Sequence, residues 1–145
     1  MNNISIIGDN CCGCRGCEQV CPTAAIEFHE NEEGFLYPRI IEEQCIQCGK
    51  CLKTCPIQNI TCFNDMQTGY GAKIENASAL KKSSSGGLSH AFALHIINQG
   101  GYVAGCAYDD SLVPKHIIVD NLSALNRLQG SKYVQSDIGN VYTEI

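Results

Sequence analysis

Eight of the 11 cysteines form two sets with the same internal spacing. The first set is Cys11, Cys14, Cys17 and Cys21; the second, displaced by 34 residues, is Cys45, Cys48, Cys51 and Cys55. Each set follows the pattern C-x2-C-x2-C-x3-C-P, in which three closely spaced thiolates can wrap one face of an iron–sulfur cubane. The spacing therefore predicts two [4Fe–4S] clusters, whose chemistry is the transfer of single electrons.

The fourth cysteine of each set is expected to act differently from the first three. In this pattern it follows the cysteine loop on a short helix and ligates the other cluster. The predicted ligand sets are therefore Cys11, Cys14, Cys17 with Cys55, and Cys45, Cys48, Cys51 with Cys21. Zinc is the alternative metal, although it favours two separated cysteine pairs in a tetrahedral set.

Other side chains of metal-binding types lie outside this spacing. Cys12 adjoins Cys11 but breaks the two-residue interval, so it is not predicted to be a ligand. Cys62 and Cys106 are predicted to be small buried apolar residues. His90 and His95 are five positions apart on a predicted helix and do not share a face, so they are expected to be packing residues.

The 34-residue offset extends beyond the cysteines and predicts two copies of one supersecondary unit. Pro22 and Pro56 match, as do Ile26 and Ile60. We expect each copy to have a short β-rich entry, a cysteine loop, a helical turn and an exit strand. A hairpin turn over 31–34 is expected between strands at 26–30 and 35–39. Residues 1–62 are thus predicted to be a two-cluster ferredoxin-like domain of the α+β class.

After about residue 62 the composition changes. Residues 63–82 are polar and are predicted to form an extended linker. Residues 88–98 are almost wholly apolar and predict a buried helix with a serine N-cap and a glycine stop. Two strands, at 102–108 and 115–120, and a helix at 122–128 follow. Residues 83–145 are therefore predicted to be a partial α/β domain.

Two short motifs in this second half could bind a cofactor. Ser85-Gly86-Gly87 opens a helix, where glycines and free N–H groups favour a phosphate; the alternative is a simple serine cap. In Gly130-Ser131-Lys132-Tyr133, Lys132 could meet a phosphate and Tyr133 could stack on a planar ring. The alternative for this second motif is an ordinary surface turn.

Composition limits the partners. The net charge of −5 gives no reason to expect nucleic acid, and no apolar run is long enough for a membrane span. The N-terminus lacks the features of an export signal, so a cytoplasmic protein is predicted. The predicted partner is a redox protein or a small organic electron acceptor.

Taken in chain order, these motifs resemble the beta-subunit family of coenzyme F-420 (deazaflavin) hydrogenases and dehydrogenases. The resemblance is carried by the two cysteine repeats, Gly34-Phe35 to Pro38, Ser84-Ser85-Gly86-Gly87, the apolar helix, and Gly130 to Ser136. It implies a flavoprotein in which iron–sulfur clusters feed FAD, which exchanges hydride with deazaflavin or another acceptor. It further implies that Ser85, Gly86 and Gly87 hold FAD phosphates while Lys132 and Tyr133 approach the cofactor. Family members continue into a larger domain, so residues 83–145 are expected to be a truncated portion of it.

Two functions are therefore predicted. The first is the iron–sulfur electron-transfer module of a flavin-dependent oxidoreductase, with no catalytic residue assigned. The second is a freestanding ferredoxin-like electron carrier without catalytic activity, in which residues 83–145 serve docking or stability.

Overall fold

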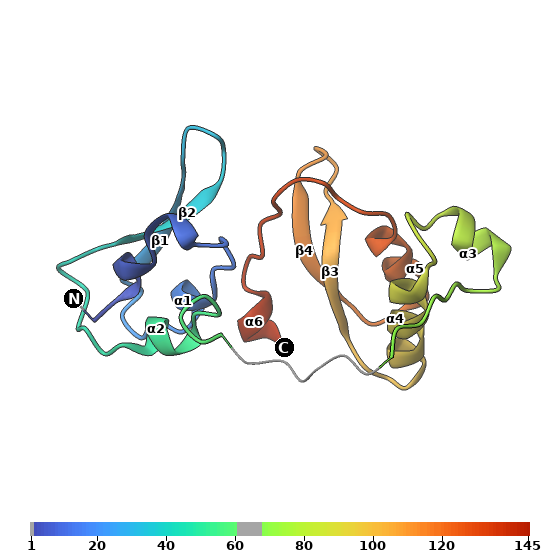
Figure 1. Cartoon of the computed structure of the whole chain (residues 1–145), viewed down its shortest axis with the longest axis horizontal. Helices are drawn as coiled ribbons and strands as arrows, with labels where there is room; N and C mark the ends of the chain where they lie inside the picture. Colours follow the sequence, from blue (N-terminus) through green and yellow to red (C-terminus); the bar gives the residue numbers. More distant parts are fainter. Residues whose placement is uncertain (1, 61–67) are drawn as a thin grey trace. The chain divides into compact units, whose positions relative to one another are not determined.

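The computed structural model of the chain describes residues 2–60 and 68–145. The chain divides into two compact units, Met1–Asn64 with Tyr142–Ile145, and Asp65–Val141 (Figure 1). Each unit combines short helices with a two-stranded antiparallel sheet, β1–β2 or β3–β4, which confirms the predicted mixture of helix and strand. Within the described ranges no helix is both long and apolar enough to cross a membrane.

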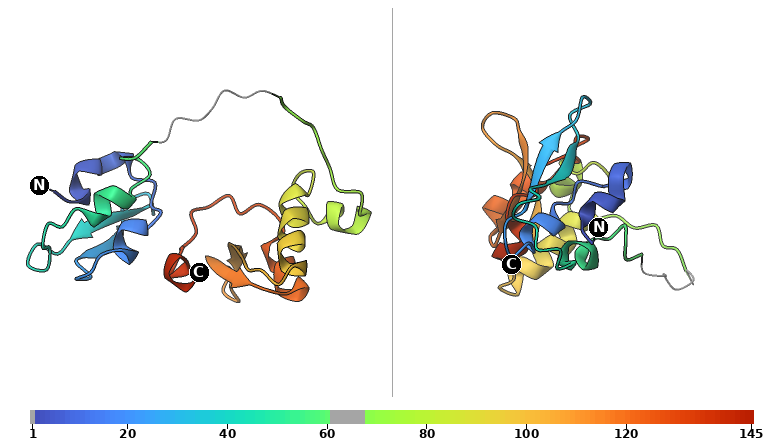
Figure 2. Two further views of the ribbon diagram at one scale, coloured as in Figure 1. Left: turned by 90° about the horizontal axis from the view of Figure 1, so that it is seen from below. Right: turned by 90° about the vertical axis from the view of Figure 1, so that its left-hand side faces the viewer.

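The first unit surrounds a β-hairpin with short helices. Its elements are η1 (Ile4–Asn10), α1 (Gly16–Gln19), β1 (Ile26–Glu30), β2 (Leu36–Ile40) and α2 (Lys50–Thr54). The hairpin pairs Ile26 with Ile40, and its turn projects from the rest of the unit (Figure 2). Asn31 closes this turn, because its Oδ1 accepts hydrogen bonds from the N–H groups of Glu33 (3.0 Å) and Phe35 (2.9 Å). The predicted hairpin is therefore confirmed.

The ends of the two repeats differ from the prediction. Residues 4–10 form the 3-10 helix η1 rather than a β-rich entry. Asn3 initiates it: its Oδ1 accepts from the Ser5 N–H at 3.1 Å, and the residue is only 1 % exposed. A side chain that caps the backbone locally competes with strand formation. After the second cysteine loop, residues 56–60 form turns instead of an exit strand.

The apolar core of the first unit is small and includes sulfur. Ile4, Ile7 and Ile26 are buried, each less than 7 % exposed. They pack in one cluster with three buried cysteines, Cys17, Cys51 and Cys55. Because thiols from both repeats belong to this core, anything bound by them contributes directly to the cohesion of the unit.

The second unit contains the predicted sequence of helix, strand, strand and helix. Its elements are α3 (Ala77–Lys81), α4 (Leu88–Asn98), β3 (Val103–Tyr108), β4 (Pro114–Val119), α5 (Leu122–Leu125) and η2 (Asn126–Leu128); α6 (Val141–Glu144) begins at its last residue. Strand β3 pairs with β4 in register Val103 to Val119, and α4 packs against α5 and β3. Leu125, 1 % exposed, is its largest fully buried side chain among the described residues.

One helix of the second unit was not expected. Residues 63–82 were predicted to be an extended linker, but Ala77–Lys81 form α3. Asn76 caps this helix, because its Oδ1 accepts from the Ala79 N–H at 2.9 Å. Residues 63–67 of the predicted linker, and Cys62 before it, lie outside the described residues.

Helix α4 has the predicted bounds but not the predicted cap. Its N-cap is Gly87, at φ 75°, and no side chain caps it, so the predicted serine cap is wrong. Ser83 instead donates its hydroxyl to the Ala79 carbonyl at 2.9 Å. The predicted glycine stop is confirmed: Gly100 and Gly101 donate to the Ile97 and Ile96 carbonyls, the bonding pattern of a Schellman motif.

The predicted burial of α4 is also wrong. None of its residues is buried; Leu88, Phe92 and Ile96, spaced four apart, are 38 %, 67 % and 42 % exposed. The all-round apolar sequence indicated burial on every side. However, the main packing partners of this helix among the described elements are β3 and α5, and they leave its outer face open.

Candidate metal centres

The two cysteine loops share the same uncommon backbone conformation. In the first loop Gly13 and Arg15 have φ of 66° and 57°; in the second, Gln47 and Gly49 have φ of 51° and 71°. These positions flank the middle cysteine and are related by the 34-residue offset. A non-glycine residue at positive φ is strained, and such residues cluster at functional sites. The repeat therefore extends to the backbone, although glycine occupies a different position in each loop.

The first cysteine loop closes around a cavity that the second repeat completes. Cys11, Cys14 and Cys17 line this cavity together with Cys55 from the end of α2. Its other walls include Ile4, Phe28 and Ile57. Three thiols from one loop and a fourth from the other repeat thus meet in an environment with several apolar side chains.

A second cavity has the same construction with the repeats exchanged. Cys45, Cys48 and Cys51 line it together with Cys21, which follows α1. Its apolar wall includes Ile26, Ile40 and Ile46. The structure therefore brings together the two sets of four cysteines that the sequence assigned to separate clusters.

The thiols of both cavities are free, and burial raises the pKa of several of them. None of the cysteines in the described residues forms a disulfide. Burial raises the pKa of Cys17 to about 12, and burial also raises the pKa values of Cys11, Cys14 and Cys51. Binding of metal must therefore displace protons from these thiols.

Several donors point at the sulfur atoms. The N–H groups of Gly13 and Ala25 donate to the Sγ atoms of Cys11 (3.4 Å) and Cys21 (3.3 Å). Although burial opposes ionisation of Cys21, hydrogen bonds from Thr23 and Ala25 lower its pKa. Such donors stabilise negative charge on sulfur, as a thiolate that ligates metal requires.

The donor set of each cavity fits an iron–sulfur cubane. Within residues 2–60 and 68–145, no three His, Cys, Asp or Glu side chains converge where a single metal ion could be held. A cubane instead presents four irons to four thiolates spread around it. Each cavity offers the number and type of donor that a cubane requires, together with apolar side chains in its wall.

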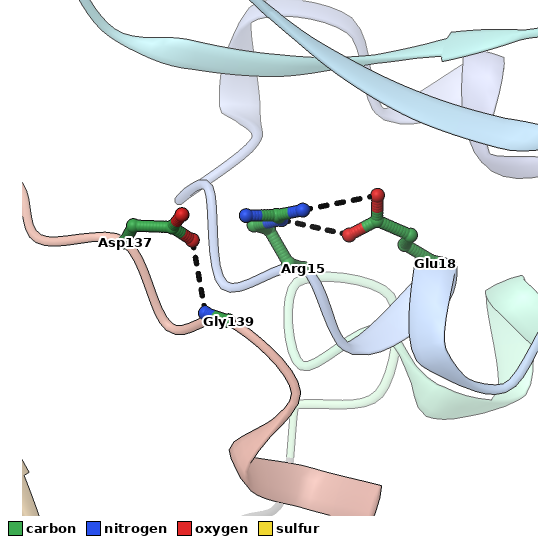
Figure 3. A network of polar contacts seen from close by, with 4 residues as sticks. All are labelled: Arg15, Glu18, Asp137 and Gly139. Atoms are coloured by element: carbon green, nitrogen blue, oxygen red, sulfur yellow. Dashed lines mark hydrogen bonds and ion pairs between the residues drawn. The ribbon is translucent and has the colours of Figure 1, made fainter. Parts of the chain in front are cut away.

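A charged pair adjoins the first cavity. Arg15, which lines the cavity, forms a two-point ion pair with Glu18: Nε to Oε2 is 2.7 Å and Nη2 to Oε1 is 3.1 Å (Figure 3). The guanidinium carbon of Arg15 also lies 5.7 Å from the centre of the Phe28 ring. The carboxylate offsets a positive charge that would otherwise act on a bound cluster. Figure 3 also shows a separate turn, which belongs to the second unit. In this turn the Gly139 N–H donates to the Asp137 Oδ1 at 2.9 Å.

A different cavity, of about 410 Å³, lies within the second unit. Its lining includes the loop 83–87, the start of α4, the β3 residues Val103–Cys106, and residues 128–131. Ser84 and Ser131, 47 positions apart, join two of these segments, because the Ser131 N–H donates to the Ser84 Oγ at 2.7 Å. The volume lies within the ~300–1,000 Å³ of small-molecule sites.

Three of the five residues predicted to bind flavin line this cavity, and the other two do not. Ser85, Gly86 and Gly87 line this cavity, whereas Lys132 and Tyr133 do not. The Lys132 Nζ donates to four main-chain carbonyls, at 3.0–3.3 Å, on residues 127–130. Tyr133 is 88 % exposed. Lys132 thus holds the loop that contributes to the cavity wall, rather than facing the cavity.

Packing explains why two of these positions are glycine. A Cβ on Gly86 would lie 2.5 Å from the Ala72 carbonyl oxygen, and one on Gly87 would lie 2.6 Å from the Ile74 side chain. The close approach of these segments therefore accounts for both glycines without a ligand.

Three residues with side chains of metal-binding types line cavities although the sequence did not predict a site there. Cys12 joins the four predicted thiols of the first cavity. Cys106 and His90 line the cavity of the second unit; Cys106 is half-buried, and the His90 Nδ1 is buried with no hydrogen-bond partner among the described residues. For Cys12 the available sequence signal was its position next to the proposed ligand Cys11. It was not predicted as a ligand because it does not fit the two-residue spacing.

Comparison with known proteins identifies the cysteine-rich segment. Residues 10–59 match the 4Fe-4S dicluster domain family. An uncharacterized polyferredoxin-like protein of Methanocaldococcus jannaschii is 34% identical over 70 residues, covering 43% of this chain and 40% of the relative. Ferredoxin-type protein NapF of Haemophilus influenzae is 37% identical over 54 residues, covering 37% and 30%. NapF of Escherichia coli K12 is 35% identical over 60 residues, covering 38% and 37%.

These matches support part of the sequence interpretation. The chain spans 30–40% of the length of these relatives. The family match ends at residue 59, so the resemblance to the deazaflavin beta-subunit family, whose more specific motifs lie at residues 84–136, stays a prediction. Residues 10–59 thus match a 4Fe-4S dicluster domain, and two of the relatives of this segment are ferredoxin-type proteins.

Proposed function

We propose that the first unit holds two [4Fe–4S] clusters with exchanged fourth ligands. Cys11, Cys14, Cys17 and Cys55 bind one cluster; Cys45, Cys48, Cys51 and Cys21 bind the other. The observation that supports this proposal is the lining of the two cavities, each with three thiols from one loop and one from the other repeat.

In this proposal the chain's residues supply binding, shielding and charge balance. The clusters supply the one-electron chemistry. Ile4, Phe28 and Ile57 limit water at the first centre, and Ile26 and Ile40 do so at the second. Because each repeat contributes ligands to both centres, the crossed ligands hold the two centres near each other. Electrons can then pass between the centres and a redox partner.

The crossing can be tested in a chain that keeps only the first centre. Cys45, Cys48 and Cys51 are replaced by Ala, and either Cys55→Ala or Cys21→Ala is then added as a matched pair. Crossed ligation predicts that Cys55→Ala lowers bound iron and acid-labile sulfide, whereas Cys21→Ala leaves both unchanged. The opposite result would show that each repeat binds its own cluster.

A mirrored pair of variants guards against loss of the fold. Cys11, Cys14 and Cys17 are replaced by Ala, and Cys21→Ala is then expected to lower bound iron while Cys55→Ala is not. Far-UV circular dichroism establishes that each background retains its secondary structure. If anaerobically purified wild-type protein contained neither iron nor acid-labile sulfide, both the crossed ligation and the clusters themselves would be contradicted.

We further propose that the second unit binds FAD and makes this chain the electron-transfer module of a flavin-dependent oxidoreductase. Support comes from the cavity, where the Ser-Gly-Gly loop and the 128–131 segment meet through the bond from Ser131 to Ser84. Ser85, Gly86 and Gly87 contact the cofactor in this proposal, while Lys132 acts indirectly by holding the loop; Tyr133 approaches the cofactor from outside the cavity.

Filling the cavity tests flavin binding. Ala104 and Ala93 line it from β3 and α4, and Ala104→Leu is expected to weaken FAD binding at least tenfold in a fluorescence titration. Tyr133→Ala is the matched variant outside the cavity and should have a smaller effect. No binding by the wild-type chain, or equal binding by Ala104→Leu, would rule out this site.

The second candidate function is a ferredoxin-type electron carrier without flavin. The family match and the NapF relatives favour it, because they concern iron–sulfur proteins. Anaerobically purified protein that shows cluster absorption, but whose spectrum gains no bound-flavin bands when FAD is added, would support this function. We place either function in the cytoplasm, where clustered thiols stay reduced.

A further inference from the structure

The two proposed centres differ by one thiol. Five cysteines line the first cavity, the fifth being Cys12, whereas four line the second. The position equivalent to Cys12 in the second repeat is Ile46. The extra thiol is therefore specific to the first loop and is not a feature of the repeat.

The backbone brings Cys12 and Cys14 together. Gly13 between them has φ of 66°, which folds the chain back, and both cysteines line the first cavity. Cys12 is exposed, whereas Cys17 and Cys55 of the same cavity are buried. Cys12 is thus accessible and lines the same cavity as the proposed ligands.

We propose that Cys12 is a reserve ligand of the first centre, able to take the place of Cys14. The inference rests on the proposed clusters. In the exchange the proton of the Cys12 thiol passes to the Cys14 thiolate as that thiolate leaves the iron. The iron–sulfur bond to Cys14 breaks, and one to Cys12 forms. No electron is gained or lost, so no oxidant or reductant is needed.

The exchange requires a small local movement only. Cys12 already lines the cavity, and it and Cys14 flank a single glycine, so rotation about the backbone at Gly13 can present either thiol. Centres on exposed surfaces lose ligands to oxidation, and a neighbouring free thiol can restore the four-thiolate set. The second centre, with Ile46 at this position, has no such reserve among the residues that line it.

The test compares Cys14→Ala with the equivalent change Cys48→Ala in the second loop. After anaerobic reconstitution, Cys14→Ala is expected to keep nearly all the iron and sulfide of wild type. Cys48→Ala and the double variant Cys12→Ala/Cys14→Ala should each lose about half. Cys12→Ala alone should keep its full content. If Cys14→Ala loses as much iron as the double variant, or fails to fold, the reserve role is wrong; full retention by Cys48→Ala would also refute it.

Alkylation of Cys12 gives a second readout. In wild-type holoprotein Cys12 should react readily with iodoacetamide, as detected by peptide mass spectrometry. In the Cys14→Ala holoprotein it should become at least tenfold less reactive, since its sulfur is then bound to iron. Unchanged reactivity would overturn the inference. Wild-type protein without iron and sulfide would instead reject the proposed clusters, so the two failures are distinguishable.

Discussion

Exchanging glycine between the two positions that flank Cys48 tests the backbone of the second loop. Gln47 and Gly49 both have positive φ, 51° and 71°, yet glycine occupies only one of them. We expect Gly49→Ala to destabilise the first unit and Gln47→Gly to stabilise it. Two changes of opposite sign, two residues apart, separate backbone strain from general effects of mutation.

The magnitudes follow from the local geometry. Left-handed backbone costs a residue with a side chain about 1–2 kcal/mol, and glycine costs about 0.4–1 kcal/mol of unfolded-state entropy. Gln47→Gly should therefore gain about 0.5–1 kcal/mol. Gly49→Ala should lose about 1–2 kcal/mol, because its Cβ would lie 2.9 Å from the Asn2 Nδ2 and disturb the bond from Asn2 to the Gln47 carbonyl.

Thermal scans of the anaerobic holoprotein measure both effects. The observable is the temperature at which half of the iron–sulfur absorption is lost, at one fixed scan rate. In a small domain 1 kcal/mol corresponds to about 4–8 °C. Gly49→Ala should lower this temperature and Gln47→Gly should raise it. A lower temperature for Gln47→Gly would show that this loop does not adopt the left-handed conformation on which the proposed centre depends.

Two further predictions concern charged side chains. Lys132→Met should destabilise the second unit by about 1–2 kcal/mol in urea unfolding without FAD, because four carbonyls lose their charged donor; equal stability would mean that Lys132 does not hold this loop. Glu18→Gln should raise the reduction potential of the first centre by on the order of tens of mV in a redox titration, because one negative charge beside the centre is removed. A lowered potential would contradict that charge balance.

Local sequence signals predicted most elements of the fold. The turn residues 31–34 located the β1–β2 hairpin, and Gly100 and Gly101 located the end of α4. The first helix, η1, was missed because its start depends on a hydrogen bond to the side chain of Asn3. A single capping residue leaves no periodic pattern in the sequence. The exposure of α4 was missed because the composition of a helix does not show how much of its surface the neighbouring elements cover.

The proposed site was predicted in part for a similar reason. Cysteine spacing fixes which thiols a tight loop can gather, and the same eight cysteines line the two cavities. Spacing alone excluded Cys12, since its place in the cavity wall depends on the positive φ of Gly13, which spacing does not reveal. Lys132 was assigned by its charge, but nearby carbonyls bind its ammonium group.

Metal and sulfide analysis of the anaerobically purified chain tests the central proposal most directly. Two cubanes predict about eight iron and eight acid-labile sulfide per chain, with an electron paramagnetic resonance signal on reduction. Zinc in place of iron, iron without sulfide, or half of these amounts would contradict two [4Fe–4S] centres held by the eight cysteines.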